Sequence, residues 1–201
     1  MLLTKCKYPS LSGANVYWDF VELPSQIMEN WVSEKECLNL FAKHYKTGEL
    51  IPDSYIESIK KSDQFMSGSA CIRQLTFVAL DLAWHSITSD FAGDIESFEK
   101  AATEKFSLLN RVNNTSLSTA FGHLFAGGYS AGYYSYKWAE VLDADAFEYF
   151  KEKGIFNKDV AKKFREEILE KGGTDHPMNL YVNFRGREPK AEALMKREGF
   201  Q

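Results

Sequence analysis

The chain has 201 residues, of which 44% are hydrophobic and 26% are charged, and its formal net charge is −4. These values are ordinary for a globular protein and exclude a largely disordered chain. No block of basic residues stands out, which disfavours nucleic acid as a partner. No apolar run approaches the ~20 residues of a membrane span, so no membrane contact is expected. Three widely spaced cysteines favour free thiols in a reducing, cytoplasmic compartment over a disulfide framework.

Apolar residues recur at helical spacing along most of the chain, and no run of alternating β-branched residues is present. Pro24 interrupts the first helical pattern, so either that helix is kinked or a second helix begins at Pro24. The longest uninterrupted pattern, from Ser67 to Ile87, predicts the central core helix. Residues 107–120, rich in Asn, Ser and Thr, predict a loop. Helices are predicted over residues 16–31, 33–45, 52–61, 67–87, 94–105, 129–153, 158–171, 175–184 and 188–197.

No linker-like segment and no internal repeat divides this series of helices. The predicted fold class is therefore all-α. Residues 1–201 are expected to form a single helical domain around one contiguous core.

Residues 121–138 are the most distinctive stretch, because glycine and tyrosine are concentrated there. Tyr129, Tyr133 and Tyr136 are spaced i, i+4 and i+7, so a helix beginning near Tyr129 would carry all three on one face. A buried phenol needs a hydrogen-bond partner, whereas a phenol at the wall of a cleft can donate to a ligand. The stripe therefore has two interpretations: packing inside a core, or the wall of a binding cleft.

His123, Gly127 and Gly128 precede the tyrosines. Glycines can adopt positive φ or let a ligand approach the backbone where a side chain would clash. Taken alone, the histidine is more typical of a capping or core residue, and the glycine pair is typical of a plain loop.

Asp19 and Glu22 form a second candidate site, since on a helix their i, i+3 spacing puts both carboxylates on one face. Two carboxylates so close repel one another unless a cation or hydrogen-bond donors lie near them. The alternative is an ordinary solvated helix face, although the neighbouring Trp18 and Phe20 make the setting unusually apolar.

These stretches resemble the thimet oligopeptidase family, which includes oligopeptidase A and the peptidyl-dipeptidases. The run from Tyr17 to Trp31 is similar to the segment that supplies the family's third zinc ligand. Residues 123–138 are similar to its substrate-binding segment, and residues 184–189 to its C-terminal pattern. The forms Tyr-Trp-Asp-Phe-Val-Glu and Gly-Gly-Tyr-x-x-Gly-Tyr-Tyr are most similar to the peptidyl-dipeptidase branch.

The resemblance implies the C-terminal helical part of a zincin-like catalytic domain, whose parent enzyme hydrolyses short peptides with zinc-activated water and releases C-terminal dipeptides. The alternatives are an oligopeptidase A-type endopeptidase and a non-catalytic helical module that binds peptides. The residue roles that the resemblance implies are Glu22 as zinc ligand, Asp19 as an acceptor that orients a ligand histidine, Tyr136 and His123 as catalytic groups, and Tyr129, Tyr133, Gly127 and Gly128 as substrate-binding residues.

The zinc-binding motif of the family is absent from this sequence. Family members bind zinc with two histidines of a His-Glu-x-x-His helix, and none of the four histidines here is followed by glutamate. The resemblance puts that motif just upstream of Met1, so the missing N-terminal part of the same enzyme is an expected partner. One carboxylate does not hold zinc, since catalytic sites use three protein ligands. The isolated chain is therefore expected to be metal-free and inactive.

Arg185 and Arg187 leave two interpretations open. They could bind the carboxylate of a substrate through paired hydrogen bonds, which a dipeptide-releasing enzyme needs. They could equally be surface charges, and the sequence alone favours surface charges.

Overall fold

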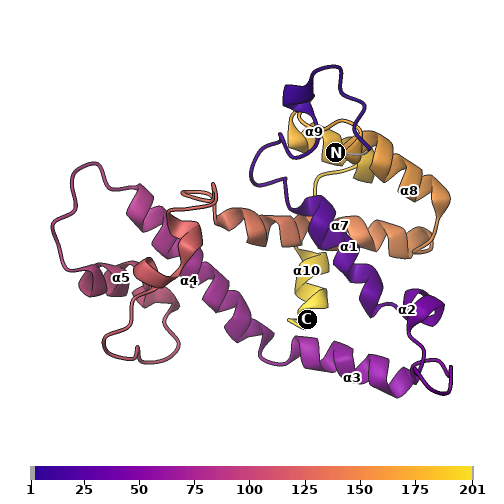
Figure 1. Cartoon of the computed structure of the whole chain (residues 1–201), viewed down its shortest axis with the longest axis horizontal. Coiled ribbons are helices and arrows are strands. Elements are labelled where there is room, and N and C mark those ends of the chain that lie inside the picture. The colour runs from indigo at the N-terminus through magenta and orange to yellow at the C-terminus, as the bar shows by residue number, and fades with distance from the viewer. Residues whose placement is uncertain (1–2, 201) are drawn as a thin grey trace. The chain divides into compact units, whose positions relative to one another are not determined.

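The computed structural model describes residues 3–200 and is built from helices (Figure 1). Within that range there is no β-strand, only one isolated antiparallel bridge between Lys43 and Leu50, so the all-α prediction is confirmed. None of the described helices is both long and apolar enough to cross a membrane. The α-helices are α1 (Leu23–Glu29), α2 (Lys35–Phe41), α3 (Asp53–Gln64), α4 (Ser67–His85), α5 (Ile95–Thr103), α6 (Leu117–Ala120), α7 (Tyr134–Lys153), α8 (Lys158–Phe164), α9 (Pro177–Arg185) and α10 (Glu192–Arg197). The other helical turns are η1 (Pro9–Leu11), η2 (Asn30–Ser33), η3 (Glu104–Phe106), η4 (Gly122–Leu124) and the π-helical turn η5 (Arg165–Leu169).

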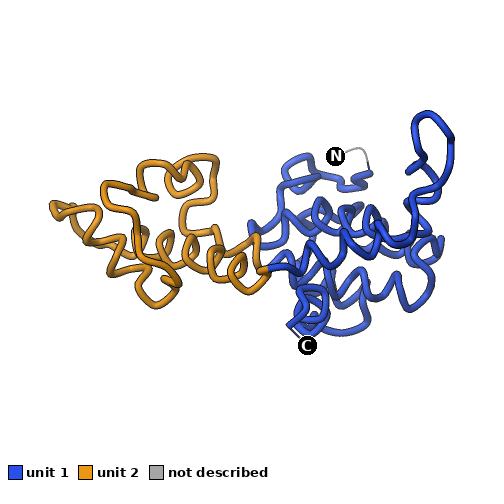
Figure 2. Tube along the Cα trace, turned by 90° about the horizontal axis from the view of Figure 1, so that it is seen from below, with its two compact units in different colours: residues 1–65, 138–201 blue, residues 66–137 orange. Residues whose placement is uncertain are grey.

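The chain divides into two compact units, which Figure 2 shows in different colours. Unit 1 contains the described residues up to Phe65 and from Trp138 onward, and unit 2 runs from Met66 to Lys137. The first four residues of α7 belong to unit 2 and the remainder to unit 1. That the whole chain acts as a single domain stays a prediction.

The core of unit 1 forms around α7. Trp31 places its ring edge-on against Phe147 and Phe150 of α7, with centroid separations of 4.7 and 4.9 Å. Its indole N–H donates to the carbonyl oxygen of Ile155 at 3.0 Å, so the polar end of this side chain is also satisfied. Full burial of a side chain such as Phe147 or Phe150 contributes roughly 1.5–3 kcal/mol, and the partly buried Trp31 covers both rings. The buried members of this core are Phe20, Leu23, Ile27, Leu142, Ala146, Phe147, Phe150, Ile155, Val160, Phe164, Ile168, Leu180, Tyr181 and Phe184.

The segment before α1 is anchored to the connection between α8 and α9. The backbone N–H of Gly173 donates to the carbonyl oxygen of Leu11 at 2.8 Å. A Cβ atom on Gly172 would lie 2.2 Å from the same oxygen, and one on Gly173 would lie 2.3 Å from the carbonyl oxygen of Asn15. Only glycine fits such close approaches. This contact fixes the chain just before residues 18–22, which carry the two candidate acids.

Asp145 of α7 is a buried acceptor for the C-terminal arginines. It receives two hydrogen bonds from the guanidinium of Arg187, at 2.6 and 3.1 Å, and one from the Tyr181 hydroxyl at 2.8 Å. Burial raises the pKa of Tyr181, and the neighbouring Asp145 charge raises it further. Arg185 lies 3.5 Å from Asp145, pairs with Glu152 at 2.7 Å, and is only 8% exposed. The preference for surface charges is therefore wrong for Arg185.

Unit 2 has its own smaller core, between α4 and α5. Trp84 packs on Phe98 with ring centroids 4.2 Å apart, and its indole N–H donates to the Ser118 hydroxyl at 2.7 Å. Phe77, also on α4, stacks on Phe121 at 4.5 Å. These contacts tie the segment before α7 to the longest apolar helix of the unit.

Most predicted helices are present, with shifted ends. The helices predicted over residues 67–87 and 94–105 occur as α4 and α5, the latter capped by Asp94, whose carboxylate accepts the Ser97 N–H. Pro24 lies in the first turn of α1, which begins at Leu23 and follows a series of turns. The alternatives for Pro24 were a kinked helix and a helix that begins at Pro24, and the structure agrees better with the second.

Candidate functional site

The tyrosine stretch is not helical where helix was predicted. α7 begins at Tyr134, and residues 129–133 form turns. Ala131 has φ +57°, a left-handed conformation that a continuing right-handed helix cannot contain. The predicted helix start at Tyr129 is therefore wrong.

The three tyrosines nevertheless come together with the histidine. The ring of Tyr129 lies 5.0 Å from the ring of His123 and 5.0 Å from that of Tyr136. Tyr136 lies 5.3 Å from Tyr133 and 6.1 Å from His123. Phe121 supports the cluster from behind, 4.9 Å from Tyr133. We call the rings of His123, Tyr129 and Tyr136 the aromatic face.

Exposure separates the members of this cluster. His123 is exposed, Tyr129 and Tyr136 are partly buried, and Tyr133 is buried at 8% exposure. The hydroxyl of Tyr133 donates to the side-chain carbonyl oxygen of Gln74 at 3.0 Å. Tyr133 is therefore placed to support its neighbours from within the fold, whereas the aromatic face can contact a ligand.

Gly127 and Gly128 form the turn between His123 and the tyrosines. Their φ angles are +79° and +84°, which L-residues with a side chain rarely adopt. The sequence allows this pair either to adopt positive φ or to let a ligand approach the backbone, and the structure supports positive φ. The turn brings Tyr129 back toward His123 within six residues.

Asp81 of α4 holds the tyrosine turn from inside unit 2. Its carboxylate is fully buried and accepts the backbone N–H groups of Ala131 and Tyr133, each at 2.9 Å. His85 lies one helical turn further on, with Nδ1 3.0 Å from Oδ1 of Asp81 and 2.8 Å from its carbonyl oxygen. Both of these atoms are acceptors, so Nδ1 carries a proton.

Glu99 of α5 holds the loop before α6, and the first turn of α6, in a similar way. Its fully buried carboxylate accepts the Ser116 hydroxyl at 2.7 Å and the N–H groups of Leu117 and Ser118 at 3.2 and 2.6 Å, and it pairs with Arg111. Burial raises the pKa of Glu99, but the hydrogen bonds from Ser118, Ser116 and Arg111 outweigh burial and lower it to about 2. The loop that leads to His123 is thus tied to a regular helix.

Asp19 and Glu22 belong to unit 1. Both are partly buried and lie in the turns that lead into α1, with Glu22 directly before its first residue. The hydroxyl of Ser25 donates to a carboxylate oxygen of Glu22 at 2.8 Å, which limits the orientations of that side chain. Glu22 is therefore held at a helix start, where a carboxylate is electrostatically favoured.

The acids, histidines and cysteines that the structure describes do not make up a zinc site by themselves. Among residues 3–200, no three His, Cys, Asp or Glu side chains lie together as a metal ion requires. A catalytic zinc takes three protein ligands, and Glu22 offers one carboxylate. A zinc ion held through Glu22 would need two further protein ligands besides this carboxylate.

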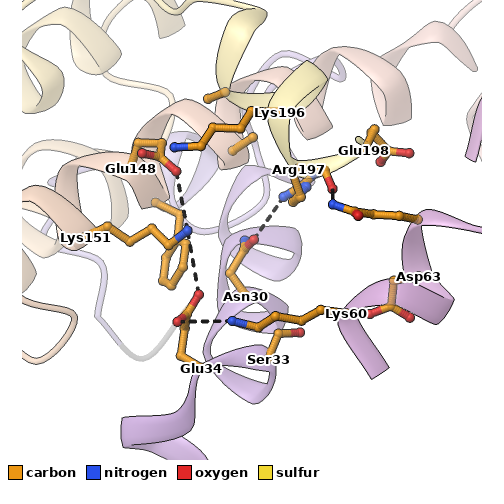
Figure 3. Close-up of a pocket in the computed structure, with 14 residues that line it drawn as sticks. Asn30, Ser33, Glu34, Lys60, Asp63, Glu148, Lys151, Lys196, Arg197 and Glu198 are labelled. Carbon is orange, nitrogen blue, oxygen red and sulfur yellow. Dashed lines mark hydrogen bonds and ion pairs between the residues drawn. The ribbon is translucent and has the colours of Figure 1, made fainter. Parts of the chain in front are cut away.

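Unit 1 also contains a charged hollow of about 340 Å³ between η2, α3, α7 and α10 (Figure 3). Lys60 and Lys151 both reach Glu34 there, at 3.6 and 3.7 Å. Arg197 pairs with Asp143 at the other end of the hollow. Because these cations are paired within the chain, the hollow joins the C-terminal helix to the core rather than presenting an uncompensated charge.

Comparison with known proteins identifies the class. A family model described as Peptidase family M3 matches residues 1–200, and the chain belongs to this family. It is 42% identical over 200 residues to oligopeptidase A of Haemophilus influenzae and 41% identical over 206 residues to that of Escherichia coli. It is 33% identical over 200 residues to dipeptidyl carboxypeptidase of Escherichia coli. These matches cover 98–100% of the chain but only 29–30% of each relative. The resemblance drawn from the motifs is confirmed.

Sequence reasoning missed the residues that hold the candidate site, namely Asp81, Glu99 and Gln74. For Asp81 the sequence does contain a signal, because this acid lies between Leu80 and Leu82 in the most apolar helical pattern. An acid in such a setting is seldom fully buried unless several donors surround it.

Replacing Glu99 with Gln should weaken the acid sensitivity of the fold. A carboxyl whose pKa falls on folding stabilises the protein above its ordinary pKa of 4.5, and that contribution disappears as the pH falls toward about 2. Between pH 5 and pH 3 the wild type should lose more thermal stability than Glu99→Gln. Glu96→Gln, an exposed neighbour on the same helix, is the control and should behave as the wild type. Equal losses in the wild type and Glu99→Gln would contradict the role of Glu99.

Proposed function

We propose that the protein carrying this chain hydrolyses short peptides in a zinc-dependent reaction, and that unit 2 supplies the groups that bind the peptide. The observation that carries the proposal is the aromatic face: three rings with polar atoms, His123, Tyr129 and Tyr136, within 5.0–6.1 Å of one another and not fully buried. Membership of a peptidase family supports a peptide as the ligand.

In this proposal Tyr136 donates its phenolic proton to the oxyanion that forms when water attacks the peptide carbonyl. Neutral phenols are donors, and a donor aimed at developing charge stabilises the transition state more than the substrate. His123 and Tyr129 bind the substrate backbone or assist the same step. Gly127 and Gly128 let their loop close over the peptide. Tyr133 was predicted to bind substrate as well, but its burial favours support of the other rings.

Glu22 is proposed as the single zinc ligand that this chain provides, with Asp19 accepting a hydrogen bond from a ligand histidine that comes from outside the chain. When bound, zinc would activate water and polarise the peptide carbonyl. The contribution of this chain is to present one carboxylate, already oriented by Ser25, and to hold the peptide.

The two kinds of peptidase among the relatives suggest different products. The motif forms favoured release of C-terminal dipeptides. The identities of 42 and 41% to two oligopeptidases A exceed the 33% to a dipeptidyl carboxypeptidase, and they favour cleavage within oligopeptides. We therefore take oligopeptide cleavage as the first candidate and dipeptide release as the second. Analysis of the products from one peptide with a blocked C-terminus separates them, because dipeptide release needs a free carboxylate.

Tyr136→Phe should lower kcat by about 100- to 1000-fold and change KM little in the peptidase that contains this chain, since one oxyanion donor is worth ~3 kcal/mol or more in the transition state. Tyr134→Phe, which removes a neighbouring phenol from outside the aromatic face, is the matched control and should retain activity. Steady-state kinetics on a short fluorogenic peptide provide the measurement. A change confined to KM would rule out the oxyanion role.

Glu22→Ala should remove zinc and activity together from the same enzyme, because a three-ligand site that loses a carboxylate binds zinc far more weakly. Metal analysis after dialysis measures the first effect and peptide hydrolysis the second. Glu29→Ala, an exposed acid at the other end of α1, controls for the loss of a charge. A Glu22→Ala enzyme that keeps one equivalent of zinc would refute the ligand assignment.

A further inference from the structure

We propose that Asp81 is a positioning residue for the aromatic face: its buried carboxylate holds turn 129–133 in the conformation that brings Tyr129 and Tyr136 against His123. The link to catalysis rests on the proposed function, whereas the structural part can be tested without it.

The Asp81 carboxylate bridges two backbone amides of the turn. One oxygen of Asp81 accepts the N–H of Ala131 and the other accepts the N–H of Tyr133, both at 2.9 Å. The two donors flank Gly132, and they lie 50 and 52 residues away along the chain. Hydrogen bonds from backbone N–H groups to a carboxylate are shorter and stronger than those between neutral groups. The pair therefore acts as a clamp on the backbone of the turn.

The turn that Asp81 holds contains a strained residue. Ala131 adopts φ +57°, which a residue with a Cβ atom avoids unless the surroundings impose it. The amides of Ala131 and Tyr133 precede α7, and the positive end of that helix favours a nearby carboxylate. Asp81 thus accepts the N–H groups of the turn and places its carboxylate next to Ala131, the residue with positive φ.

The Asp81 carboxylate is itself held in place by His85. His85 donates from Nδ1 to Oδ1 of Asp81 at 3.0 Å and shares the same proton with the Asp81 carbonyl oxygen at 2.8 Å. Its ring lies 5.7 Å from that of Phe125, next to the turn of Gly127. Asp81 therefore stands between a histidine on its own helix and the tyrosine turn, and it cannot rotate without losing hydrogen bonds to one of them.

The first test needs no variant. In the isolated chain, the amide protons of Ala131 and Tyr133 should exchange with solvent at least 100-fold more slowly than those of unpaired loop residues, as measured by NMR. Exchange of both amides at the rate of an unprotected loop would overturn the proposal.

The second test is Asp81→Asn, which keeps the size of the side chain but leaves one acceptor oxygen for two N–H groups. The ring protons of His123, shifted in the wild type by the Tyr129 ring, should move toward the values of a free histidine. Amide signals of unit 1 should stay unchanged, which separates a local effect from unfolding. Asp90→Asn makes the same change at an exposed acid of the same unit and should leave the His123 signals in place. Unchanged His123 signals in Asp81→Asn would overturn the proposal.

A rescue distinguishes positioning from a general structural role. Glycine adopts positive φ without strain, so Ala131→Gly in the Asp81→Asn background should restore at least half of the His123 shift. In the peptidase, Asp81→Asn should lower kcat about tenfold with KM within twofold, and Ala131→Gly should recover part of the loss. Loss of the His123 shift with unchanged kcat would refute the catalytic role of the aromatic face and leave the clamp intact. A double variant with no recovery of the His123 shift would refute the clamp itself.

Discussion

The hydrogen bonds between the Asp81 carboxylate and the backbone of residues 131 and 133 are the contact on which the candidate site depends. A buried carboxylate is stable only when donors surround it, and here the donors belong to the segment that carries the tyrosines. The same two hydrogen bonds supply the donors that the buried carboxylate needs and hold the backbone of the turn in place. The positions of Tyr129 and Tyr136 are therefore coupled to α4, the longest apolar helix of unit 2.

Glu99 on α5 has a matching role, because it ties the loop before His123 to a regular helix. Two irregular segments are thus held by two buried acids on helices. Functional groups are commonly carried on loops that a rigid scaffold positions, and loops need such anchors to present a defined geometry. In unit 1, Gly172 and Gly173 perform a similar task by allowing the segment before Glu22 to lie directly on the α8–α9 connection.

The sequence predicted the helices whose periodicity is uninterrupted, such as α4 and α5, because amphipathic spacing is local information. It also singled out His123 and the tyrosines as candidate residues by their types, although the helical face that the tyrosine spacing predicted does not form. It misplaced the start of α7, because the left-handed conformation of Ala131 depends on an acid fifty residues away. The burial of Arg185 was missed for the same reason, since it follows from pairing with Asp145 and Glu152. Ion pairs between residues that lie far apart in the chain leave no pattern in the local sequence.

The most direct measurement is the affinity of the proposed peptidase for a phosphinic peptide, whose tetrahedral oxygens resemble the oxyanion formed during peptide hydrolysis. If Tyr136 donates to that oxyanion, Tyr136→Phe should weaken binding of the phosphinic peptide by about 10- to 100-fold. Binding of an uncleaved peptide of the same sequence should change by less than about twofold. Equal losses for both ligands, or no loss for either, would contradict a role of the aromatic face in the transition state.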